Sequence, residues 1–182
     1  MENKYISDKY LGENWDILKV SSLFKEKIRK IYAEKEIIDG YMNALDVVYK
    51  ELKKQNNPSP GLKPFYLNQM CLPFLYLCRH TIELCMKNFL EYNKITFEQN
   101  HSLKKIWKLI QDNIQDDLKG YNELIMTFNE LDRDGSRLRY IKDKNGEEYT
   151  TKPIFIDSSS IYEKTKELCN YLNNKLNYNK ES

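Results

Sequence analysis

The stretch FYLNQMCLPFLYLCRHTIELCMKNFLEY, residues 65–92, decides the fold because its apolar residues recur at helical spacing. Steps of three and four residues place one set on a single wide stripe: Cys71, Phe74, Leu75, Cys78, Ile82, Cys85 and Phe89. Leucines and a methionine fill much of the remaining surface. A helix that is apolar nearly all round is buried in a bundle or at an oligomer interface. We therefore predict a central helix, which either begins near Pro73 or is kinked there.

Helical patterns flank this stretch on both sides. Before it, the apolar stripe from Ser22 to Leu52 fits one long helix or two helices joined near Gly40. After it, Ser102 is a good N-cap for a helix that begins at Leu103, and another helix is expected near residues 120–131. A capping box, Ser160 to Glu163, is expected to open the last helix. The sequence predicts an all-α bundle of four to five helices.

Two kinds of segment depart from the helical pattern. QNNPSPGLKP, residues 55–64, reads as a loop, and YIKDKNGEEYTTKP, residues 140–153, predicts a small β-hairpin that turns at Asn145-Gly146. Residues 1–20 are expected to form an N-terminal arm, and residues 177–182 a frayed tail. We predict one domain over residues 1–182.

Composition excludes several classes of function. The chain has 29 Lys and Arg against 27 Asp and Glu, and a net charge of +2 argues against a strongly basic nucleic-acid clamp. Its four cysteines form no C-x-x-C pair, so we expect buried thiols, no metal site and no cofactor. We see no signal peptide and no run long enough to span a membrane, which predicts a cytoplasmic protein with reduced thiols.

The central helix carries an unusual strip of titratable groups. Arg79 to Glu83 and Glu83 to Lys87 are both i, i+4 pairs, and His80 lies three residues before Glu83. In one interpretation the strip is an ion-pair network that fixes helix packing or a dimer seam. In the other, Arg79, His80 and Glu83 are catalytic, and His101 folds over them instead of being an exposed residue at a helix entry.

A second group of residues suits phosphate or RNA. Arg137, Arg139 and Tyr140 combine forked cations with an aromatic ring, and Lys87 adds a further cation. Aspartates interleave with the arginines, so salt bridges within a turn are the competing interpretation.

Three short motifs together resemble HEPN-like bacterial proteins. The first is the run from Arg79 to Lys87, with its Arg-His pair and Ile-Glu-Leu triplet, and the others are His101-Ser102-Leu103 with Trp107 and the segment Leu131–Tyr140. The resemblance implies an α-helical bundle that is often a dimer. It also implies one of two roles, a ribonuclease of toxin–antitoxin or phage-defence systems or a non-catalytic partner.

The sequence departs from the family at the ribonuclease motif, which is an Arg followed by four to six residues and then a His. The places counted from Arg79 hold Leu84, Cys85 and Met86, so the standard catalytic pair does not carry over. The resemblance therefore favours a homodimer that acts through protein–protein contact in a defence, counter-defence or toxin–antitoxin setting. The alternatives are a metal-independent endoribonuclease centred on Arg79, His80 and Glu83, and a helper that binds a nucleotide or phosphate on the same strip.

Overall fold

The computed structural model describes residues 27–55, 70–98, 100–139, 142, 145–146 and 156–176. The chain divides into two units, Met1–Glu36 and Ile37–Ser182. In the first unit the described residues are 27–36, which open a helix. The predicted arm, residues 56–64 of the predicted loop and the predicted tail lie outside the described residues.

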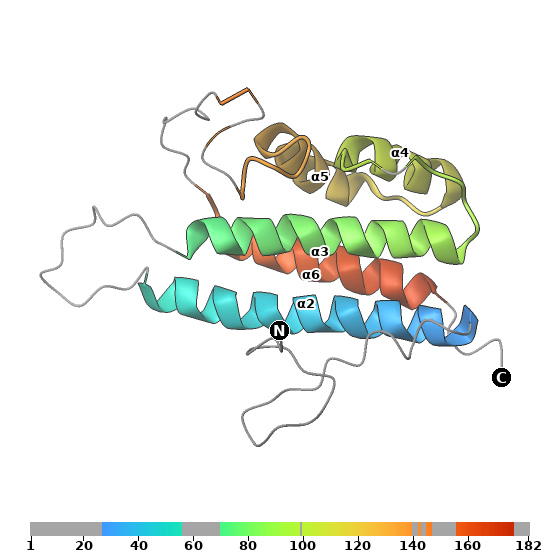
Figure 1. The fold of residues 1–182 in the computed structure, drawn as a ribbon, viewed down its shortest axis with the longest axis horizontal. Helices are drawn as coiled ribbons and strands as arrows, with labels where there is room; N and C mark the ends of the chain where they lie inside the picture. The colour runs from blue at the N-terminus through green and yellow to red at the C-terminus, as the bar shows by residue number, and fades with distance from the viewer. Residues whose placement is uncertain are drawn as a thin grey trace, which may run out of the picture. The chain divides into compact units, whose positions relative to one another are not determined.

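The described residues contain five helices and no strand, which confirms the all-α prediction. The helices are α2 (Lys27–Gln55), α3 (Cys71–Tyr92), α4 (Leu103–Asn113), α5 (Lys119–Leu131) and α6 (Ser158–Lys175). In Figure 1, α3 and α6 run side by side in the same direction and α2 runs the opposite way. Helices α4 and α5 pack on each other along the other side of α3 from α2. The long apolar helix is therefore central to the bundle.

The helix boundaries settle two open questions and correct one prediction. Helix α2 continues through Gly40, and α3 begins at Cys71, which places Pro73 in the first turn, where proline is tolerated. Ser102 caps α4 as predicted. The predicted capping box at Ser160 is wrong, because α6 begins at Ser158. Asp157 caps it, accepting hydrogen bonds from the backbone N–H groups of Ser159 and Ser160.

The predicted hairpin over residues 140–153 falls almost entirely outside the described residues, and the structure gives it no support. Lys142, Asn145 and Gly146 are the described residues in that range, and they form no strand. Gly146 has a φ of +82°, which is the left-handed backbone that a tight turn uses.

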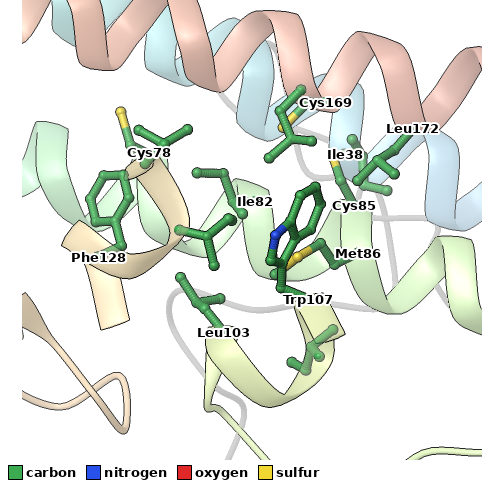
Figure 2. Packing of buried hydrophobic residues seen from close by; sticks show 14 of the residues in the cluster. Ile38, Cys78, Ile82, Cys85, Met86, Leu103, Trp107, Phe128, Cys169 and Leu172 are labelled. Atoms are coloured by element: carbon green, nitrogen blue, oxygen red, sulfur yellow. The ribbon is translucent and has the colours of Figure 1, made fainter. Parts of the chain in front are cut away.

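The core is built around the α3 stripe (Figure 2). Trp107 of α4 is fully buried against it, and its indole N–H donates a 2.7 Å hydrogen bond to Asn122 Oδ1 on α5. Cys78, Cys85 and Cys169 are buried thiols and Cys71 is half-buried, as the sequence predicts for cysteines that act as small hydrophobic residues. Burial raises the pKa of the Cys78 thiol to about 12, which keeps it protonated and unreactive.

Candidate functional site

Arg79 lies on the face of α3 that two loops cover, and its side chain is only 3% exposed. Each arm of the guanidinium donates to a different partner. Nε donates to the carbonyl oxygen of Asp132 at 2.9 Å, and one Nη donates to Glu83 Oε2 at 2.9 Å. The other Nη donates to the carbonyl oxygen of His101 at 2.7 Å. Arg79 therefore ties α3 to the loop before α4 and to the loop after α5.

Glu83 is the carboxylate at the centre of this network. Its Oε2 accepts from Arg79, while its Oε1 accepts from Lys87 Nζ at 2.7 Å and from His101 Nδ1 at 2.8 Å. An ionised carboxylate only accepts, so His101 carries its proton on Nδ1. Burial by itself would raise the pKa of Glu83, but the hydrogen bond and charge of Lys87, then His101 and Arg79, hold that pKa below its usual value.

A second carboxylate, Asp132, supports the network from the end of α5. It is fully buried, and its Oδ1 accepts the backbone N–H of Arg137 at 3.0 Å. Its Oδ2 lies 3.5 Å from Arg79 Nε, close enough for charge attraction, but makes no hydrogen bond. Gly135 follows with a φ of +79°, and a Cβ there would lie 3.2 Å from an Arg79 Nη. A side chain at residue 135 would therefore have to adopt positive φ and press on the guanidinium, so glycine suits the close approach of this loop to Arg79.

His80 does not join this network, although the sequence placed it on the same strip. One residue after Arg79, it points about 100° further round the helix. Its ring meets the edge of Tyr41 on α2 at 4.7 Å and stacks on Tyr76 at 5.5 Å between centroids. The expected pairing of His80 with Glu83 is therefore wrong, and His101 takes that place. Partial burial, followed by the charges of Arg79, Arg139 and Lys87, lowers the pKa of His80 despite the opposing charge of Glu83.

The residues predicted to hold phosphate do not form one patch. Lys87 forms an ion pair with Glu83. Arg139 Nε donates to the carbonyl oxygen of Gly135 at 2.6 Å, and its guanidinium lies 5.9 Å over the ring of Tyr76. Arg137 is half-buried, and Tyr140 lies outside the described residues. Their proposed role in binding phosphate or RNA stays a prediction.

Asp132 and Gly135, which close the network from the loop after α5, were not predicted as site residues. A signal was present, since both lie in the motif Leu131–Tyr140, and a glycine after Asp-Arg-Asp is typical of a turn that needs positive φ. Chemically, the buried part of the site holds two carboxylates neutralised by cations. The exposed part is the His101 imidazole, 61% exposed and oriented by Glu83.

Comparison with known proteins gives one family. The sequence model of the HEPN domain matches residues 73–174, which spans α3 to α6 and covers more than half of the chain. No curated protein and no solved structure matches the chain. None of the described helices is long and apolar enough to cross a membrane, and the described residues hold no group of three side chains suited to a metal.

Proposed function

The chain belongs to the HEPN domain family, and on that premise we propose that it acts by contact with another protein in a defence, counter-defence or toxin–antitoxin setting, without the family's standard ribonuclease chemistry. We propose further that it does so as a homodimer. A monomeric mass by light scattering at micromolar concentration would remove the dimer and leave the rest of the proposal standing.

The observation that carries the proposal is the position of Arg79. This arginine matches the motif arginine of the family's ribonucleases, where a free guanidinium is needed to hold a phosphate. Here the guanidinium is 3% exposed and donates to Glu83 and to two backbone carbonyl oxygens. A phosphate could reach it only if both loops opened. The buried arginine therefore supports a structural role, and the absence of a histidine at positions 84–86, after a spacer of four to six residues, supports the same conclusion.

The test is an RNA cleavage assay without added metal. Purified wild-type protein and the variant His80→Ala are incubated with total RNA and with tRNA, and fragments are resolved by electrophoresis. We expect no cleavage by either protein. Cleavage by the wild type would overturn the proposal.

One observation favours a second candidate, the metal-independent endoribonuclease. An exposed imidazole held by a buried carboxylate is a common arrangement for proton transfer, and His101 on Glu83 has that geometry at 2.8 Å. If this candidate is right, wild-type protein cleaves RNA and His101→Ala abolishes cleavage. His80→Ala should then retain cleavage, because His80 is not bonded to Glu83.

A further inference from the structure

Two buried thiols meet where α3 packs against α6. Cys85 on α3 and Cys169 on α6 are both fully buried, and both belong to the cluster drawn in Figure 2. The two thiols share a hydrogen bond, which together with burial raises the pKa of Cys169 well above its usual value. A cysteine side chain is short, so thiols from two helices can bond only where the helix backbones approach closely. A disulfide requires the same close approach.

The other pairs of cysteines are less well placed. Cys71, Cys78 and Cys85 lie on one helix at steps of seven residues. A rise of 1.5 Å per residue separates neighbours in this series by roughly 10 Å, whereas a disulfide joins Cα atoms that are at most about 7 Å apart. Cys78 acts on Cys169 through charge, while Cys85 is bonded to it directly. The packing of α3 on α6 therefore selects Cys85 as the partner of Cys169.

Two facing thiols have two chemical uses, because they can hold a soft metal ion or form a disulfide. Among the described residues, no group of three side chains is suited to a metal, so an ion between these thiols would have no third ligand there. A disulfide needs no further residue. The pair also requires no access from the surface in its final form, since both sulfur atoms already lie inside the bundle.

We propose that Cys85 and Cys169 form a reversible disulfide that locks α6 onto α3 when the protein meets a hydroperoxide. One thiol, as its thiolate, attacks an oxygen of the peroxide and becomes a sulfenic acid, and with hydrogen peroxide the other oxygen leaves as water. The second thiol attacks the sulfenic sulfur, the S–S bond forms, and a second water leaves. The two thiols thus lose two protons and two electrons, and a thiol reductant returns them.

Burial determines how fast this disulfide forms. A buried thiol stays protonated and is a poor nucleophile, so the first step requires α6 to open transiently from α3. When α6 closes again, the second thiol is held against the sulfenic acid. The disulfide should therefore form slowly in native protein, and once formed it prevents the opening that allowed it. This lock concerns the core of the bundle and goes beyond the proposed function, which does not depend on it.

The test is peptide mapping after oxidation with hydrogen peroxide. Reduced, folded wild-type protein is oxidised in dilute solution at neutral pH, its remaining thiols are alkylated, and it is digested with trypsin. Trypsin places Cys85 and Cys169 in separate peptides, residues 80–87 and 167–175, that hold no other cysteine. We expect these two peptides to be linked in the main product. Oxidation in denaturant is the control, because an unfolded chain should favour cysteines close in sequence, such as Cys78 with Cys85.

Thermal unfolding measures the lock itself. The Tm of the oxidised protein should exceed that of the reduced protein by about 5 °C or more, because the cross-link restricts the unfolded chain, and dithiothreitol should abolish the difference. Cys169→Ala should lose both the cross-link and the rise in Tm. The matched control Cys78→Ala removes another fully buried thiol and should keep both. Each variant is compared with its own reduced form, so a change in its basal stability does not affect the comparison.

Three results would overturn the lock. The first is prolonged oxidation of wild-type protein that leaves Cys85 and Cys169 reduced, or converts them to sulfinic acids, without a cross-link between them. The second is a main product in which either peptide is linked to the one that carries Cys78. The third is the expected cross-link with no rise in Tm, which would show that the bond strains the bundle. None of these involves RNA cleavage or a protein partner, so the lock and the proposed function can fail separately.

Discussion

Replacing Glu83 with alanine should destabilise the protein by about 3 kcal/mol, because it removes the acceptor shared by three donors. Breaking a buried ion pair from one side typically costs about 3–5 kcal/mol, since the remaining charge stays buried without compensation. The lower end of that range applies here. Arg79 keeps both backbone carbonyl acceptors and the charge of Asp132, and Lys87, 18% exposed, can turn toward water. The alanine also leaves a small void beside α3.

The assay is equilibrium unfolding in urea, with thermal unfolding as a second measurement. A loss of about 3 kcal/mol corresponds to a Tm lower by roughly 6–12 °C for a protein of this size. The matched control is Glu123→Ala, the same change at an exposed position of α5, which should alter stability by less than about 0.5 kcal/mol. A loss below about 1 kcal/mol for Glu83→Ala, with an unchanged urea slope, would refute the structural role that we give to this network.

Three further predictions concern the same contacts and the core. Gly135→Ala should lower the free energy of unfolding, measured in urea, by about 1–3 kcal/mol, and by more than Gly146→Ala does. Both positions have positive φ, but only a Cβ at 135 would press on Arg79, and equal losses would contradict that contact. The difference in free energy of unfolding between wild type and Glu83→Gln should have its full value above about pH 4.5. This difference should shrink as the pH falls through the pKa of Glu83 in the folded protein, which lies below its usual value, because the carboxylate then becomes protonated. A difference that grows in acid would show that the pKa of Glu83 is raised instead. In native protein a thiol reagent should label Cys71 well before Cys78, Cys85 and Cys169, all four reacting together in denaturant, and rapid native labelling of Cys169 would contradict its burial.

The helices were predictable because their signals are local. Apolar spacing located α3, and a serine followed by an apolar run located the start of α4. The start of α6 was misplaced because two N-cap signals stand close together. Asp157 and Ser160 are both suitable N-cap residues. In the structure the Asp157 carboxylate accepts from two backbone N–H groups, and the sequence alone does not show that this cap is preferred over the serine of the capping box.

The sequence predicted several residues of the candidate site but not the contacts that they make. The i, i+4 rule correctly paired Arg79 with Glu83 and Glu83 with Lys87. It could not show that His80 turns toward Tyr41, because that depends on where α2 packs. It also could not show that backbone carbonyls of residues 101 and 132 would reach Arg79, since tertiary contacts to the main chain leave no trace in residue type.

The pairing of α3 with α6 has a consequence for synthesis on the ribosome. These helices lie side by side in the bundle, yet α6 is translated more than sixty residues after α3 ends. Until residues 158–175 emerge, the apolar side of α3 that α6 later covers has no cover from the chain itself. A nascent chain in that interval is a natural client for chaperones and is prone to associate with other such chains. Codons that slow translation between α5 and α6 would lengthen that exposure, so the yield of native protein should depend on how quickly this last helix is delivered.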